Sequence, residues 1–123
     1  MLAPEYGGDG KKVGECAKKG QPAAAYPGHW APNGLAFAKD GAFIAFHGSW
    51  NRSPEPQQGY NVVFQPFVDG KPKGEYQIIA DGFAGARKEP GLAAHRPAGI
   101  AVGPDGALYI TDDSGGRVWR VVR

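Results

Sequence analysis

Two stretches of the chain share one pattern of short apolar runs separated by turn residues. The stretch PNGLAFAKDGAFIAFHGSWNR, which begins at Pro32, aligns without a gap with PAGIAVGPDGALYITDDSGGR, which begins at Pro97. Subtracting the two starting numbers gives an offset of about 65 residues. Internal self-similarity is typical of proteins built from repeated supersecondary units. We therefore predict that the chain contains two copies of one structural unit.

Each copy predicts a β-hairpin at its start. Two apolar runs flank an Asp-Gly pair, which is Asp40-Gly41 in the first copy and Asp105-Gly106 in the second. Glycine readily adopts the positive φ that tight hairpin turns need, so Asp-Gly between two such runs is a strong hairpin signal. The predicted strands are residues 34–37 and 42–46 in the first copy, and residues 99–102 and 107–111 in the second.

The first copy predicts two further strands. Residues 60–67 form a run rich in β-branched and aromatic side chains, and residues 76–80 form a shorter run after a turn at residues 69–72. Four consecutive antiparallel strands make a meander, which is one blade of a β-propeller. The second copy predicts only a third strand, residues 117–122, as in a propeller whose last blade takes one strand from the opposite terminus. The predicted fold class is all-β, with about two propeller blades.

These elements divide the chain into four predicted segments. They are an irregular N-terminal loop or inter-blade segment (residues 1–30), a complete blade (31–83), a connecting loop (84–96) and a partial, three-stranded blade (97–123). Two blades cannot close a ring, and they leave apolar faces and unpaired strand edges exposed. Either the remaining blades belong to a longer gene product, or the chain self-associates, with three copies making a six-bladed ring.

The composition agrees with short strands and excludes several function classes. The 123 residues are 41% hydrophobic and include 20 Gly and 11 Pro spread along the chain, which suits tight turns rather than long helices. The net charge of +2 comes from interspersed charges of both signs, so nucleic acid is not an expected partner. No apolar run approaches the roughly 18 residues of a membrane span, and the first ten residues show no signal-peptide pattern.

Two features near the N-terminus have simple interpretations. A small basic cluster is predicted to be a solvated loop; it consists of Lys11, Lys12, Lys18 and Lys19. Cys16 is the one cysteine of the sequence, so it cannot form an intrachain disulfide. A free thiol and a disulfide with a cysteine outside this sequence both remain open.

The two copies diverge after their second strand, and the candidate chemistry lies there. The first copy has HGSWNR at residues 47–52, where the second has DDSGGR at residues 112–117. An insertion at residues 53–59 enlarges the first loop. Loops at strand ends on a rigid scaffold commonly carry binding groups.

The side chains of this loop, together with Arg96, match a planar, polyanionic ligand. Arg52 and Arg96 can each pair with a carboxylate, Asn51 can bond a carbonyl edge, and Trp50 can stack on a ring. A purely structural interpretation is also open. In that interpretation Trp50 packs between blades, Arg52 lies on the surface like its repeat counterpart, and His47 donates to a backbone carbonyl.

Other chemistries find little support in the sequence. His29, His47 and His95 lack the spacing of a zinc site, so no metal site is predicted. Asp112-Asp113 is followed by Ser-Gly-Gly and is interpreted as a turn that caps its own backbone rather than as a cation site. The sequence contains no dinucleotide-binding GxGxxG after a strand, no Walker loop and no GxSxG elbow.

The motifs resemble those of a known enzyme family. The run GAFIAFHGSWNRSPEPQQGYNVVFQPFVDGKPKG, followed by HRPAGIAVGPDGALYITDDSGGRVWRV, resembles the C-terminal region of sugar dehydrogenases that depend on pyrroloquinoline quinone (PQQ). The resemblance is to the sorbosone/pyranose dehydrogenase type, related to soluble glucose and aldose-sugar dehydrogenases, and it covers residues 27–123. HGSWNR with a downstream RPxGxAVxPDGxLY is its specific part.

The resemblance implies a six-bladed propeller that holds PQQ over its central channel, oxidises an aldose or similar sugar and passes electrons to an external acceptor. It implies that His47, Asn51 and Arg96 line the cofactor pocket, with Trp50 and Arg52 as further candidates. His47 would contact PQQ or the substrate hydroxyl and is the candidate catalytic residue for proton transfer, while Arg96 would neutralise a PQQ carboxylate.

The resemblance also bears on what lies outside this chain. It implies Ca²⁺ in the full-length family, with its ligands and the main catalytic base supplied by blades that this chain lacks. Relatives are exported, which implies a periplasmic or secreted protein.

Three hypotheses of function follow. The chain is part of a PQQ-dependent sugar dehydrogenase, a non-catalytic β-propeller module that binds a ligand or protein, or a truncated and inactive fragment. HGSWNR and Arg96 favour the first hypothesis over the second, whereas the length of 123 residues favours the third over a self-sufficient enzyme.

Overall fold

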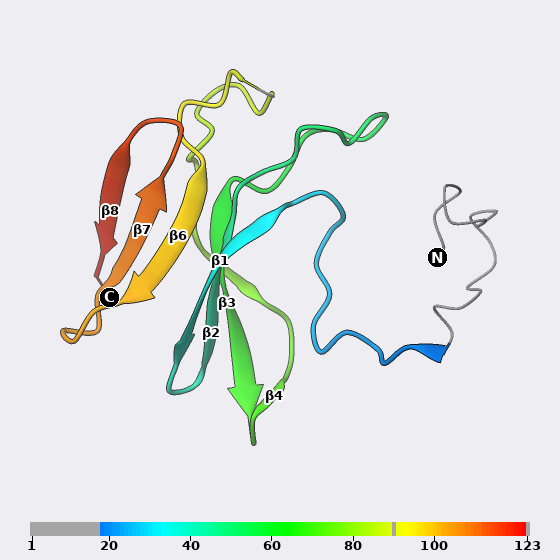
Figure 1. Ribbon diagram of the computed structural model, residues 1–123, viewed down its shortest axis with the longest axis vertical. Coiled ribbons are helices and arrows are strands. Elements are labelled where there is room, and N and C mark those ends of the chain that lie inside the picture. Colours follow the sequence, from blue (N-terminus) through cyan, green and yellow to red (C-terminus); the bar gives the residue numbers. More distant parts are fainter. Residues whose placement is uncertain (1–17, 90, 123) are drawn as a thin grey trace.

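The structure, a computed structural model, describes residues 18–89 and 91–122 as two antiparallel sheets (Figure 1). The first sheet contains β1 (Pro32–Ala38), β2 (Gly41–Phe46), β3 (Asn61–Val68), β4 (Lys71–Pro72) and β5 (Gln77–Ala80). The second sheet contains β6 (Pro97–Val102), β7 (Leu108–Asp112) and β8 (Arg117–Val121). The described residues include no α-helix, and the predicted all-β class, made of propeller blades, is confirmed.

The first sheet is the predicted meander, with one local difference. β2 pairs with β1 on one side and β3 on the other, and β5 pairs with β3 as the fourth strand. The predicted turn at residues 69–72 is shorter than expected, because Lys71 and Pro72 pair with the end of β3 as the small strand β4. Asp69 and Gly70 alone span the connection with φ of 51° and 73°, the positive values of a two-residue hairpin turn.

The second sheet has the simple order β6-β7-β8 within the described residues. β7 pairs antiparallel with β6 and with β8, and Gly106 of the predicted Asp-Gly turn has φ of 77°. The hairpin predicted from Asp105-Gly106 is therefore present. Lys18 and Lys19 are exposed, whereas Lys11, Lys12 and Cys16 lie outside the described residues.

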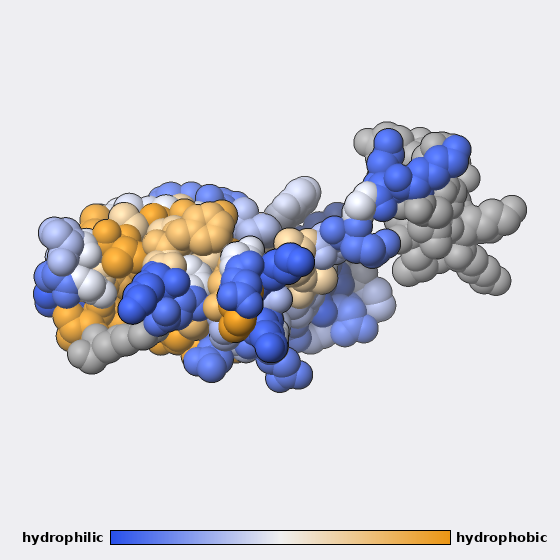
Figure 2. All heavy atoms as spheres, turned by 90° about the horizontal axis from the view of Figure 1, so that it is seen from below, coloured by the Kyte–Doolittle hydropathy of each residue, from blue (hydrophilic) through white to orange (hydrophobic). Residues whose placement is uncertain are grey.

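The middle of the first sheet is covered on both faces. One face packs against the second sheet through a core that includes Phe43, Val62 and Ile110. On the opposite face Trp30 joins a smaller cluster, against which Tyr26 packs. All six residues of β2 are buried, because the sheet lies between the second sheet and the segment that precedes β1. Figure 2 shows hydrophobic residues gathered where the two sheets lie, and mostly hydrophilic residues on the N-terminal side of the described chain.

The two sheets approach each other along their first strands, so that β1 lies beside β6 (Figure 1). A Cβ at Gly34 in β1 would lie 2.5 Å from the carbonyl oxygen of Ala98 in β6, so a glycine is required for this approach. The loops that follow β2 and β7 then lie at the same end of the two sheets. None of the described helical turns is long and apolar enough to cross a membrane.

Candidate functional site

The loop between β2 and β3 is closed at its base by Ser49, which is fully buried. The backbone N–H of Ser49 donates to the carbonyl of Gln58 at 2.8 Å, and the hydroxyl of Ser49 accepts from the N–H of Gln58 at 2.8 Å. The Ser49 hydroxyl also donates to the side chain of Gln57 at 2.6 Å, and the hydroxyl of Tyr60 donates to the Ser49 carbonyl at 2.5 Å. These bonds hold the neck of the loop in one conformation.

Beyond this neck the loop presents its candidate side chains outward. Trp50 is 68% exposed and does not pack between the two sheets that the structure describes. Asn51 is also exposed. Arg52 is half-buried, and its Nε donates to the carbonyl of Pro56 in the same loop at 3.3 Å. Trp50 and Asn51 are therefore open to a ligand, whereas Arg52 helps to fold its own loop.

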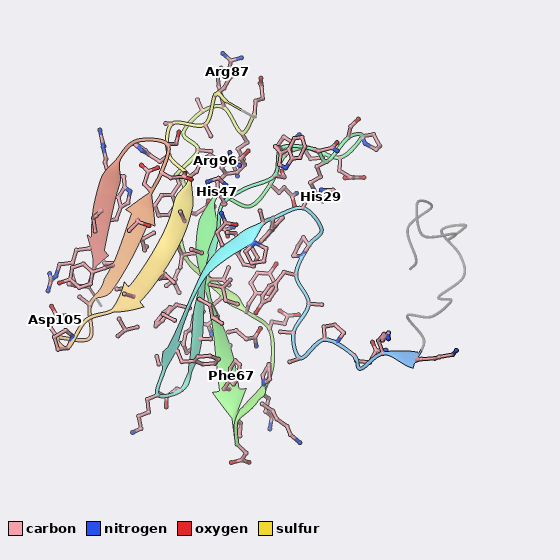
Figure 3. The ribbon with its side chains drawn as sticks, in the orientation of Figure 1. His29, His47, Phe67, Arg87, Arg96 and Asp105 are labelled. Atoms are coloured by element: carbon pink, nitrogen blue, oxygen red, sulfur yellow. The ribbon has the colours of Figure 1, made fainter. Side chains whose placement is uncertain are left out.

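Arg96 crosses from the second sheet to this loop. It lies directly before β6, and its side chain donates from Nε to the carbonyl of His47 at 3.1 Å and from Nη2 to the carbonyl of Gly48 at 2.9 Å. The guanidinium also lies over the ring of Tyr60, with 5.6 Å between Cζ and the ring centroid. Figure 3 shows Arg96 and His47 together at one end of the sheets, with Phe67 and Asp105 at the other.

His47 makes a second link between the sheets. Its Nε2 lies 2.8 Å from Oδ1 and 3.0 Å from Oδ2 of Asp113, which follows β7. An ionised carboxylate only accepts hydrogen bonds, so Nε2 of His47 carries the proton in this contact. The interpretation in which the His47 side chain donates to a backbone carbonyl is thus replaced by a carboxylate partner from the other sheet.

Asp112, next to Asp113, is a buried carboxylate with many partners. Its Oδ1 accepts from the backbone N–H of Arg96 at 2.9 Å and from those of Ser114 and Gly115 at 3.0 Å each, and its Oδ2 lies 2.6 Å from Nδ1 of His95. Burial alone would raise the pKa of Asp112, but the hydrogen bonds outweigh it and hold the pKa below its usual value. The sequence interpretation of this turn as one that caps its own backbone agrees with the bonds to Ser114 and Gly115.

Sequence reasoning missed Asp113 as a partner of His47 and Tyr60 as the support below Arg96. Burial raises the pKa of Tyr60, and the positive charge of Arg96 opposes this shift in part. Asp113 lies 66 residues from His47, so only the packing of the two sheets brings them together. Ser49 carried one usable signal, because it aligns with Ser114 in the repeat.

The structure brings together two of the five predicted site residues, His47 and Arg96, and leaves Trp50, Asn51 and Arg52 farther along the loop. His29 is exposed with φ of 65° and is not bonded to them in the described part of the chain. A cavity of about 700 Å³ lies elsewhere, where residues 23–25 cross the edge of the first sheet. The described residues contain no group of three or more His, Cys, Asp or Glu side chains that could hold a metal ion.

Comparisons with known proteins point to one family. A family model described as TrAA12-like matches residues 8–123. The holo form of the pyranose dehydrogenase PQQ domain from Coprinopsis cinerea superposes with a TM-score of 0.70 and 27% identity, covering 89% of this chain and 31% of that one. The calcium structure of the family AA12 enzyme of Trichoderma reesei gives a TM-score of 0.59 and 25% identity, covering 73% of this chain and 24% of that one.

A curated relative is an uncharacterized protein of Borreliella burgdorferi, which is 33% identical over 106 residues. That match covers 77% of this chain and 26% of the relative. The chain thus spans about a quarter to a third of the length of the proteins that it matches.

Proposed function

Because this chain belongs to the TrAA12-like family, whose model matches residues 8–123, we propose that it is part of a PQQ-dependent sugar dehydrogenase and forms a section of the cofactor pocket. The observation that carries the proposal is the contact between Arg96 and the 47–52 loop, in which a guanidinium from one sheet bonds two carbonyls of the other. A cation held between two rigid sheets is suited to bind an anionic ligand at their junction.

The donor set fits a planar cofactor that carries carboxylates. A guanidinium has five N–H donors, and Arg96 uses two of them for His47 and Gly48, which leaves three for a carboxylate. The exposed indole of Trp50 offers a face for stacking, and the exposed amide of Asn51 can bond a carbonyl edge. Bound PQQ would supply the two-electron acceptor that oxidation of a sugar hydroxyl requires.

His47 is the group that moves a proton in this proposal. Its Nε2–H donates to Asp113, so Nδ1 of the neutral ring is an acceptor. An imidazole that a carboxylate orients in this way is the usual arrangement of a general base. Within this chain we therefore propose Nδ1 of His47 as the group that accepts a proton from the substrate hydroxyl and Asp113 as the group that orients the ring, while the main catalytic base belongs to the further blades.

The active centre is proposed to need more than this chain. The chain covers 31% of the Coprinopsis PQQ domain and 24% of the Trichoderma enzyme. Further blades, from a longer protein or from other copies of this chain, would complete the pocket and provide the ligands of Ca²⁺. The sugar and an external electron acceptor would be the small-molecule partners of the completed propeller.

The proposal is tested by titrating the protein with PQQ in the presence of Ca²⁺ and by following dye reduction with aldoses. We expect saturable PQQ binding that Arg96→Ala weakens roughly tenfold or more, because a charge-assisted contact is lost. The matched control is Arg87→Ala, which removes an exposed guanidinium paired with Glu89 on the connecting segment and should change affinity less than about twofold.

Two results would overturn the assignment. Equal effects of the two arginine substitutions would show that Arg96 is not in the pocket. A protein with neither PQQ binding nor dye reduction would leave the non-catalytic module or the inactive fragment as its function.

A further inference from the structure

Asp112 is an acidic side chain that the proposed function does not use, and it is the most completely buried acid of the described residues. It ends β7, and its side chain has 0% exposure. A buried carboxylate is costly unless hydrogen bonds compensate for lost hydration. Four groups surround the carboxylate, namely three backbone N–H donors and the ring of His95. Their hydrogen bonds compensate for the hydration that the carboxylate loses on burial.

These partners connect two separate segments. Ser114 and Gly115 belong to the turn after β7, whereas His95 and Arg96 directly precede β6. One carboxylate therefore fixes the main chain of Arg96 relative to the strand that lies beside it. Its Oδ1 is the acceptor for the Arg96 N–H, at 2.9 Å.

The repeat provides an internal comparison for this role. In the first sheet the position that corresponds to Asp112 is His47, and the position that corresponds to Arg96 is Ala31. There the two segments are joined by a backbone bond from the N–H of His47 to the carbonyl of Ala31 at 2.8 Å. In the first copy the two segments are therefore joined without a carboxylate. The carboxylate, Asp112, occurs in the second copy, which is also the copy that carries Arg96.

We propose that Asp112 is a positioning residue that holds Arg96 for the anionic ligand of the pocket. Asp112 fixes the backbone end of Arg96, and the carbonyls of His47 and Gly48 fix the guanidinium end. With both ends held, the remaining N–H groups of Arg96 point in one direction before any ligand binds, which lowers the entropic cost of binding. This inference rests on the proposed function, in which Arg96 binds a carboxylate.

The test compares Asp112→Asn with the wild type in two measurements. The asparagine removes the charge, so the three N–H donors, among them that of Arg96, face only a neutral and weaker acceptor. In the unliganded protein we expect the Nε–H proton of Arg96, followed by its NMR cross-peak, to exchange faster with solvent in the variant than in the wild type. In the PQQ titration we expect affinity to fall roughly tenfold, the size seen when an orienting partner is removed.

A double-mutant cycle separates positioning from general stability. In the Arg96→Ala background, Asp112→Asn should change PQQ affinity less than about twofold, because the group through which it acts is gone. The matched control is Asp105→Asn, a carboxylate of the same sheet that pairs with Arg120 at the opposite end and should leave the Arg96 cross-peak and affinity unchanged. Gly115→Ala is a second variant, since its Cβ would displace the carboxylate and His95 without changing their chemistry.

The outcomes separate this inference from the proposed function. An unchanged Arg96 cross-peak in both Asp112→Asn and Gly115→Ala would overturn positioning by Asp112, whether or not PQQ binds. Equal losses of affinity from Asp112→Asn in both backgrounds would overturn it as well. If the Asp112→Asn variant loses the protection of the Arg96 Nε–H while the protein fails to bind PQQ, the positioning of Arg96 by Asp112 is supported and PQQ is refuted as the ligand.

Discussion

Tyr60 connects the hydrophobic core to the candidate site at the scale of a single residue. Its ring is fully buried, and a Cβ at Gly48 would collide with it, which explains the glycine with φ of 97° at that position. The same ring lies below the guanidinium of Arg96, and the hydroxyl bonds the carbonyl of the buried Ser49. One side chain thus supports the neck of the loop and the cation beside it.

We expect Tyr60→Phe to lower the free energy of unfolding by about 1–3 kcal/mol, because it leaves the carbonyl of Ser49 without its donor in a buried place. Urea unfolding of the purified protein measures this change. The control is Tyr109→Phe, which removes a hydroxyl that accepts from Arg120 at an exposed site and should cost less than about 0.5 kcal/mol. Equal costs for the two substitutions would contradict the role given to Tyr60.

The residues of the site were predictable only where the repeat or a motif marks them. HGSWNR differs from DDSGGR at the same repeat position, and both this difference and the HGSWNR motif mark His47 and its loop. Asp113 and Tyr60 carry no such mark, since each acts through a contact that the packing of two sheets creates. Whether each predicted residue binds the cofactor stays a prediction that the titrations above decide.

At the scale of elements, the hairpins followed from local chemistry and the inter-sheet contacts did not. Gly106 forms the predicted Asp-Gly turn with its positive φ, whereas the first hairpin turns at Lys39 and Asp40, and Gly41 already pairs with Ala38 as the first residue of β2. The flanking apolar runs are the strands β1, β2, β6 and β7. The pairing of Lys71 and Pro72 was missed, because a strand of two residues has no periodicity to detect. The approach of β1 to β6 left only one trace in the sequence, the glycine that recurs at residues 34 and 99.

Gly34→Ala tests this approach of the two strands. The added Cβ would meet the carbonyl of Ala98, and overpacking of this kind costs about 1–3 kcal/mol of folding free energy. Gly28→Ala is the control, because a Cβ there meets no atom within 4 Å and should be neutral or stabilise by up to about 1 kcal/mol. Thermal unfolding of both variants measures the difference, and an unchanged midpoint for Gly34→Ala would mean that the sheets do not meet as described.

At the scale of the whole molecule, the first sheet has more apolar surface than its covering segment hides. Leu35, Ile44, Val63 and Ile78 are neighbours in register across β1, β2, β3 and β5 and therefore share one face. The two in the middle are buried below Trp30 and Tyr26, whereas Leu35 is 57% and Ile78 is 51% exposed. Phe37, two residues after Leu35 on the same face, is 66% exposed.

This face predicts that the isolated chain self-associates in solution, with copies of the chain packing on the first sheet. Exposed apolar patches on the face of a sheet favour association because burial removes them from water. Sedimentation velocity at rising protein concentration should show the mean mass increase, and Phe37→Ser should shift that increase to higher concentration. Since Phe37 is mostly exposed, the substitution should change folding stability by less than about 1 kcal/mol.

Lys39→Ser, in the exposed turn after β1, is the control and should associate as the wild type does. Phe37→Ser that associates as strongly as the control would place the contact on another surface. A wild type that remains a monomer at every concentration would exclude self-association. The apolar face would then need a partner other than this chain, which is the arrangement expected if further blades lie in a longer protein and cover the first sheet from its outer side.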